Sequence, residues 1–157
     1  MWESEGIRKD NKFTPEDKFL KVRRSYFTRT GQPILTPTFS QNQLIVVRLA
    51  LSSVGVAYNV NNVVMSDMLP AGFEIENPRL VEDREMPWIK NASTPSYFDI
   101  RDDRINYFVD ANKTEKYYYY LARAITKGTF IQGSASADAM YNGNFRSYSG
   151  GGKVVVN

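Results

Sequence analysis

The sequence predicts an all-β fold, a two-sheet antiparallel β-sandwich of about seven or eight strands that is immunoglobulin-like in the broad sense. Short apolar or alternating stretches recur at spacings of about 8 to 15 residues, with turn residues between them. Aromatic residues are abundant, with ten Tyr, nine Phe and two Trp, and strands favour such side chains. No stretch has the convincing periodicity of an amphipathic helix.

The first half of the chain holds the clearest strand. Residues 19–27, FLKVRRSYF, alternate, and the basic cluster Lys18, Lys21, Arg23 and Arg24 interleaved with them indicates an edge strand with a solvated charged face. Thr28 to Pro33 form a turn in which Gly31 can take a positive φ. Residues 43–53, QLIVVRLALSS, are almost continuously apolar with Arg48 as the one charge, which predicts a central strand.

The middle of the chain alternates short strands with long polar connections. Residues 58–65, YNVNNVVM, predict a strand with one solvated face. Pro70 and Gly72 then take the chain out of the sheet, which it re-enters at Phe73. Residues 81–95 form a long polar connection, which contains Trp88 and is typical of a Greek-key crossover.

The second half predicts a series of strands at 97–100, 104–110, 116–126, 129–139 and 153–156, with a turn at Lys127-Gly128 and a flexible joint at 150–152. Four tyrosines stand in a row at 117–120. Successive strand residues face opposite ways, so Tyr117 and Tyr119 share one face and Tyr118 and Tyr120 the other. We therefore expect one pair in the core and the other covered by neighbours, rather than a flat ligand platform.

Composition excludes several kinds of chemistry. The chain has no cysteine and no histidine, which rules out disulfides, thiol nucleophiles, Ser-His-Asp triads and zinc sites built from those residues. The net charge is +3 and the pI about 9.1, which is ordinary for a folded domain and predicts no nucleic-acid partner. No apolar run approaches the roughly 18 residues of a membrane span. The sequence thus predicts no membrane contact by this domain.

Candidate functional groups are few. The acidic residues Asp99, Asp102 and Asp103 could hold a cation, but Arg101 and Arg104 stand among them and favour local salt pairing. A sugar site made of Trp88 and one tyrosine pair stays open. We predict no catalytic residue, no metal and no cofactor, so the domain is expected not to be an enzyme.

Four segments, in order, carry a family resemblance: LIVVRLALSS (44–53), DMLPAGFEIENPRL (67–80), FDIRDDRINYFVD (98–110) and the stretch from YYYLARA to KVVV (118–156). Together they resemble the C-terminal macroglobulin-like (MG10-type) domain of bacterial α2-macroglobulins. The resemblance covers residue 18 to the end, so we expect a polar tail or linker at 1–17 and a macroglobulin-like sandwich at 18–157.

The resemblance implies a function through other domains. It implies a non-enzymatic part of a large exported protease trap, periplasmic or anchored on the periplasmic side of the membrane, which meets host or competitor proteases as the full-length protein. The domain would pack on a thioester-type domain of the same polypeptide. Met140 and Tyr141 match a family Met-Tyr pair that shields the thioester from water. The alternative is an adhesin-type or carbohydrate-binding sandwich of a surface protein.

Overall fold

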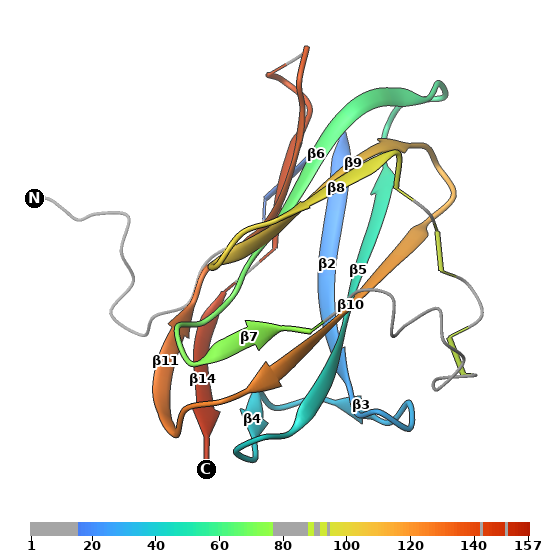
Figure 1. Ribbon diagram of the computed structural model, residues 1–157. Helices are drawn as coiled ribbons and strands as arrows, with labels where there is room; N and C mark the ends of the chain where they lie inside the picture. Colours follow the sequence, from blue (N-terminus) through green and yellow to red (C-terminus); the bar gives the residue numbers. More distant parts are fainter. Residues whose placement is uncertain (1–15, 77–87, 90–91, 94, 142, 150) are drawn as a thin grey trace, which may run out of the picture.

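The computed structural model describes residues 16–76, 88–89, 92–93, 95–141, 143–149 and 151–157, and these residues form strands and turns without a helix (Figure 1). No helix of this part of the chain could cross a membrane. The strands are β1 Glu16–Lys18, β2 Leu20–Phe27, β3 Pro33–Ile34, β4 Thr38–Phe39, β5 Leu44–Ser53, β6 Val60–Met68, β7 Phe73–Ile75, β8 Tyr97–Ile100, β9 Arg104–Ala111, β10 Lys116–Ala124, β11 Gly128–Gln132, β12 Ala135–Ala139, β13 Arg146–Ser149 and β14 Gly152–Val156.

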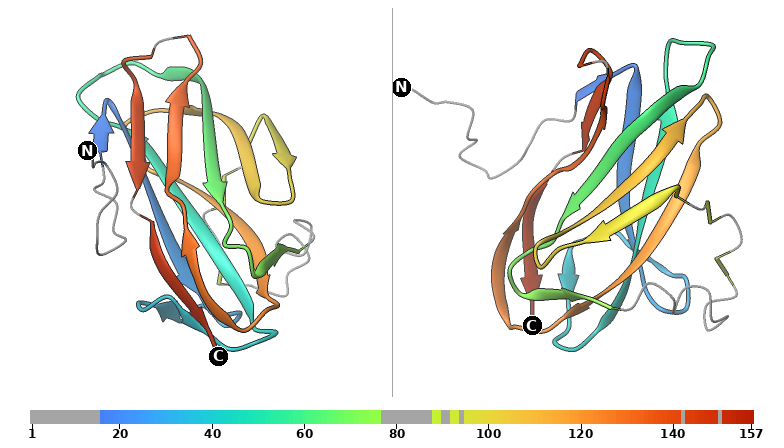
Figure 2. Two further views of the ribbon diagram at one scale, coloured as in Figure 1. Left: turned by 90° about the vertical axis from the view of Figure 1, so that its left-hand side faces the viewer. Right: turned by 45° about the horizontal axis from the view of Figure 1, so that its top comes forward.

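Two large sheets form the layers of the sandwich. One has the order β1-β13-β12-β6-β9-β8 and the other β3-β2-β5-β10-β7, and a smaller sheet, β11-β14-β4, lies at one end. In the left view of Figure 2, β6, β12 and β13 lie in front of the diagonal strands β2 and β5. All pairings within the two large sheets are antiparallel, and β14 pairs with β4 in parallel. The predicted all-β antiparallel sandwich is confirmed.

The main core lies between the two large sheets. Each strand contributes every second residue, so Leu49 and Leu51 of β5 meet Met65 of β6 and Ile105 of β9, all of them fully buried. The predicted central strand is confirmed, because β5 pairs over eight residues with both β2 and β10. Burying this continuous apolar surface is the main favourable contribution to the stability of the fold.

The tyrosine row divides as predicted. Tyr118 and Tyr120 are buried in the core, whereas Tyr117 and Tyr119 lie on the outer face of the five-stranded sheet. On that face Trp88 stands edge-on to Tyr119, with ring centroids 6.3 Å apart, and packs on Phe27 at 5.5 Å. The outer tyrosine is therefore covered by a neighbouring ring and forms no open platform.

Two predictions about strands are wrong. The strand expected at 129–139 is two strands, because the chain leaves β11 of the small sheet after Gln132 and enters β12 of the six-stranded sheet at Ala135. The prediction that the basic residues of β2 share a solvated face fails at Arg24, whose side chain is only 5% exposed. Arg24 points to the same inward side as Leu20 and Val22, and there it forms an ion pair with Asp67.

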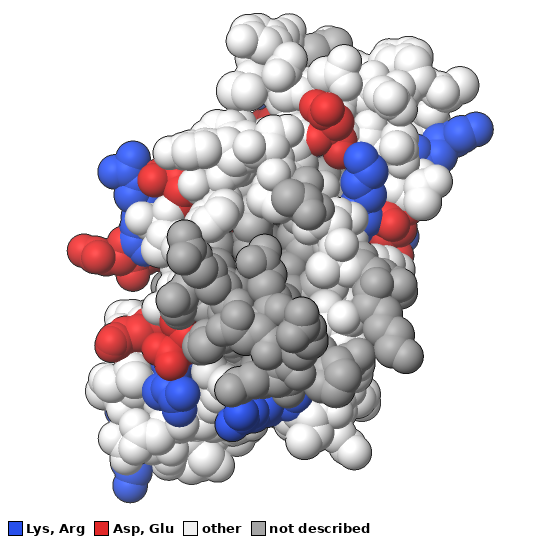
Figure 3. Space-filling model, turned by 45° about the vertical axis from the view of Figure 1, so that its right-hand side comes forward, with Lys and Arg blue, Asp and Glu red and all other residues white. Residues whose placement is uncertain are grey.

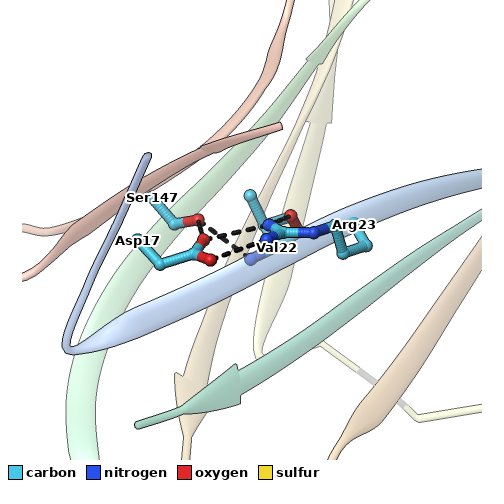
Figure 4. A network of polar contacts seen from close by, with 4 residues as sticks. All are labelled: Asp17, Val22, Arg23 and Ser147. Atoms are coloured by element: carbon cyan, nitrogen blue, oxygen red, sulfur yellow. Dashed lines mark hydrogen bonds and ion pairs between the residues drawn. The ribbon is translucent and has the colours of Figure 1, made fainter. Parts of the chain in front are cut away.

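A strand precedes β2 and is fixed by polar contacts. β1 pairs with β13, and Asp17 accepts hydrogen bonds from Arg23 at 2.6 and 2.9 Å and from the Ser147 hydroxyl at 2.6 Å (Figure 4). The Val22 amide donates to the same hydroxyl at 3.0 Å. The hydrogen bond from Arg23 lowers the pKa of Asp17. The predicted boundary between tail and domain thus falls within β1, and residues 1–15 lie outside the described residues.

The long connection is described only in part. Of the predicted Greek-key crossover at 81–95, residues 81–87, 90–91 and 94 lie outside the described residues, as does Gly150 of the predicted glycine joint. The chain passes from β7 in the five-stranded sheet to β8 at the edge of the six-stranded sheet. Trp88 is held by its Nε1–H, which donates to the Arg29 carbonyl at 2.8 Å.

Candidate functional site

Met140 and Tyr141 lie in the turn that joins β12 to β13. Two backbone hydrogen bonds hold the start of this turn, from the Ala139 amide to the Phe145 carbonyl at 3.0 Å and from the Met140 amide to the Asn62 carbonyl at 2.8 Å. Met140 is 47% exposed and Tyr141 83% exposed. The turn therefore presents two large apolar side chains to the outside from a fixed backbone.

The residues around the pair form an apolar end surface, which we define as Phe19, Val54, Tyr58, Met140, Tyr141 and Phe145. Phe145 is buried and anchors it, with its ring centroid 4.9 Å from that of Phe19 and 6.5 Å from that of Tyr58. Tyr58, Tyr141 and Phe145 also line an open hollow of about 180 Å³ together with Asn59 and Asn61. None of the residues that line this hollow carries a charge.

Backbone strain gathers at the same end. Phe19 has φ = 63° and Asn62 φ = 60°, and the pairing of β6 with β9 shifts register between Val60 and Val63. Asparagine tolerates the left-handed conformation, whereas a bulky aromatic residue rarely adopts it. Strained residues of this kind gather at functional sites, where the surrounding structure holds them. The end surface therefore combines exposed apolar side chains with a constrained backbone.

Two of the acidic residues near β8, Asp99 and Asp103, are paired locally. Asp99 accepts a hydrogen bond from Arg101 at 2.7 Å, and Asp103 lies 3.2 Å from Arg104, whose hydrogen bond lowers the pKa of Asp103. Among the described residues no group of acidic side chains converges as a metal site would require. On the face drawn in Figure 3, basic and acidic side chains lie next to each other. The local salt pairing expected from the sequence is thus present.

A buried polar network between the sheets escaped the sequence analysis. Asp67 of β6 is fully buried and accepts hydrogen bonds from Arg24 of β2 and from the Tyr120 hydroxyl of β10. Tyr26 of β2 donates a hydrogen bond to Gln132 of β11 and so connects the five-stranded sheet to the small sheet. Burial raises the pKa of Tyr26 to about 12 and that of Tyr120 well above its usual value, the latter also through the Asp67 charge.

A sequence signal for this network existed. Asp67 is two residues beyond Met65, and Arg24 two beyond Val22, so both lie in register with buried apolar positions of their strands. A single acid and a single base at inward positions point to a buried ion pair. The network ties the layers together and does not reach the apolar end surface.

The described residues form a β-sandwich with an exposed apolar end surface, and exposed apolar surfaces are typical of interaction sites. The particular family follows from comparison. The family model described as "Bacterial Alpha-2-macroglobulin MG10 domain" matches residues 20–144. The chain belongs to this family, whose members are protease inhibitors rather than enzymes, and the resemblance inferred from the sequence is confirmed.

Individual alpha-2-macroglobulins are also similar to this chain. An alpha-2-macroglobulin of Pasteurella multocida is 30% identical over 131 residues, covering 83% of this chain and 6% of the relative. An alpha-2-macroglobulin homolog of Yersinia pestis is 26% identical over 156 residues, covering 87% and 8%. The crystal structure of Salmonella alpha-2-macroglobulin reacted with methylamine has a TM-score of 0.81 at 28% identity, covering 92% and 10%. The chain thus spans about a tenth or less of its relatives' length.

Proposed function

We propose that this chain is the non-enzymatic C-terminal domain of a bacterial alpha-2-macroglobulin that traps proteases, and that it packs on the thioester-type domain of the same polypeptide. In this proposal Met140 and Tyr141 cover the thioester and keep water from it. The exposure of Tyr141, 83% on a turn held by hydrogen bonds and by buried Phe145, carries the proposal. An exposed apolar pair on a fixed backbone is ready to be buried by a partner domain.

The chemistry of the pair suits this role. A thioester is an activated acyl group, and its lifetime in water depends on apolar bulk that excludes the attacking water molecule. The methionine side chain adapts to irregular gaps, while the tyrosine ring supplies a large flat apolar surface with a hydroxyl at its edge. The uncharged hollow beside Tyr141 offers further room for an apolar side chain of the partner.

The decisive experiment uses the parent protein with an intact thioester. Tyr141→Ala should raise its reactivity toward methylamine, because water and small amines then reach the acyl group. Tyr97→Ala is the matched control, since Tyr97 is an exposed tyrosine, 62% accessible, on the edge strand β8. Reactivity that is equal in Tyr141→Ala and the unmodified parent would remove the shielding role.

The cellular location of the full-length parent protein is part of the same proposal. It would be exported, periplasmic or anchored on the periplasmic side, and it would meet host or competitor proteases there. One solved relative is Escherichia coli alpha-2-macroglobulin activated by porcine elastase, which at 21% identity supports the fold of this chain alone. Cell fractionation with an antibody to the domain tests the compartment, and recovery in the cytosolic fraction would contradict it.

A further inference from the structure

One arginine on the outer face of the five-stranded sheet, Arg48, has no acidic partner among the described residues. Arg48 lies in the middle of β5, opposite Ser25 of β2 and Tyr119 of β10. Its Nε atom is buried without a hydrogen-bond partner, and none of the ion pairs among the described residues includes it. A buried donor without an acceptor is costly, so native proteins normally provide one.

Two aromatic rings hold this arginine in place. The guanidinium carbon of Arg48 lies 4.9 Å from the ring centroid of Phe27 on β2 and 4.9 Å from that of Tyr117 on β10. Contacts of a cation with ring faces fix the orientation of the group but offer no hydrogen-bond acceptor. The guanidinium is thus positioned in advance of binding, and its Nε donor is unused.

The arginine opens onto a groove with an apolar wall. The groove has a volume of about 550 Å³ and runs between β2 and residues 33–37, so that Phe27, Pro33, Leu35 and Pro37 line it with Arg48. Leu35 is 91% exposed, more than any other large hydrophobic side chain of the described residues. Such exposure of a leucine beside an unpaired cation combines the two features by which a peptide segment is recognised.

We propose that this groove binds a peptide segment of another domain of the parent polypeptide, with an aspartate or glutamate on Arg48 and an adjacent apolar side chain on Leu35. The guanidinium fork matches a carboxylate in two parallel hydrogen bonds. The groove lining contains one further arginine, Arg24, but its side chain is buried and paired with Asp67. One available arginine does not suit a nucleic acid, whose phosphates require several basic groups. The matched region covers only 6% to 10% of three curated relatives, so most of the length of such proteins lies outside it and could provide the segment.

This groove is separate from the apolar end surface. Arg48 lies on the outer face of the five-stranded sheet, whereas Met140 and Tyr141 follow β12 of the six-stranded sheet. The two surfaces would let the domain contact two neighbours at once. Loss of either function therefore leaves the other measurable.

The test measures the nuclear magnetic resonance signal of the Arg48 side chain. The Nε–H signals of the 157-residue chain are recorded by nuclear magnetic resonance while acetyl-Leu-Asp-Leu-amide is added, with acetyl-Leu-Asn-Leu-amide as the neutral probe. The Arg48 signal should shift with the aspartyl peptide and stay in place with the asparaginyl one. Arg48→Met, which keeps the length and apolar packing of the side chain, should weaken binding about tenfold or more, as the loss of a paired charge does.

Two further variants sharpen the result. Leu35→Ser should also weaken binding, because it removes the exposed apolar contact. Arg101→Met is the control, since Arg101 is exposed and already bonded to Asp99. Equal shifts with both peptides, or unchanged affinity in Arg48→Met, would overturn the proposal. A shift of the Arg48 signal with protein concentration alone would assign the groove to a second copy of the chain instead.

Discussion

Asp67 on β6 and Arg24 on β2 form an ion pair in the core that joins the two large sheets. Their side chains are 0% and 5% exposed. Tyr120 completes the arrangement from β10 by donating to the second oxygen of Asp67. A pair removed from water in this way contributes specificity more than stability, yet the loss of one partner leaves a buried charge alone.

We therefore expect Arg24→Met to lower the free energy of unfolding by about 3 to 5 kcal/mol, because Asp67 is then buried without its partner. Urea unfolding followed by tyrosine fluorescence measures this. Arg101→Met removes an exposed pair and should cost less than about 1 kcal/mol. Equal small losses in both variants would mean that the buried pair carries no special penalty.

Stability should fall when the solution becomes strongly alkaline. Burial raises the pKa of Tyr26 and of Tyr118 to about 12, whereas an unfolded tyrosine ionises near about 10. Between these values the unfolded chain loses protons that the folded chain retains, so the free energy of unfolding decreases as the pH rises from about 10 to about 12. Urea midpoints across this range test the trend, and Tyr118→Phe should flatten it. A constant midpoint would contradict the raised pKa values.

Gly72 should not tolerate a side chain. A Cβ atom there would lie 2.6 Å from the ring of Phe130 and 3.1 Å from the carbonyl oxygen of Thr126. Gly72→Ala should therefore destabilise the fold by about 1 to 3 kcal/mol through overpacking. Gly143→Ala is the matched control, because nothing lies within 4 Å of its added atom. The melting temperatures of the two variants compare them, and similar values would argue against crowding at Gly72.

Exposed and buried residues of the apolar end surface should differ in their effect on the free energy of unfolding. Tyr141→Ala should change the free energy of unfolding by less than about 0.5 kcal/mol, because the side chain is exposed. Phe145→Ala should cost about 3 to 5 kcal/mol, because it removes the buried ring on which Phe19 and Tyr58 pack. Chemical denaturation measures both. A large loss in Tyr141→Ala would make this residue part of the fold rather than an interface.

Much of the fold follows from local patterns that can be read in the chain. The apolar run at 43–53 predicts a central strand, and β5 occupies that place because its side chains are buried on nearly every residue. Alternation places Tyr118 and Tyr120 on one face of the strand and Tyr117 and Tyr119 on the other, and the structure shows that the first pair lies in the core. The break at Gly133 was not visible, because the stretch keeps its alternation while the chain changes sheets.

The sequence also marked the candidate site, but it could not describe it. The resemblance singles out Met140 and Tyr141, and the structure places them in a turn beside Tyr58 and Phe145, which are distant along the chain. Their shielding role stays a prediction. Whether an apolar side chain is exposed depends on which distant parts of the chain pack against it, so a local sequence pattern cannot predict it.

By itself, then, the sequence determines the fold class, the absence of cysteine and histidine chemistry, and the family, because these depend on residue types and short-range periodicity. Tertiary structure alone decides that Arg24 is buried against Asp67 while Arg48, on the neighbouring strand, has no carboxylate partner among the described residues. Arg24 stands in an alternating stretch and Arg48 in an almost continuously apolar one, and neither pattern tells which guanidinium has a carboxylate partner. Their environments differ because the burial and pairing of a charge depend on groups that only folding brings together.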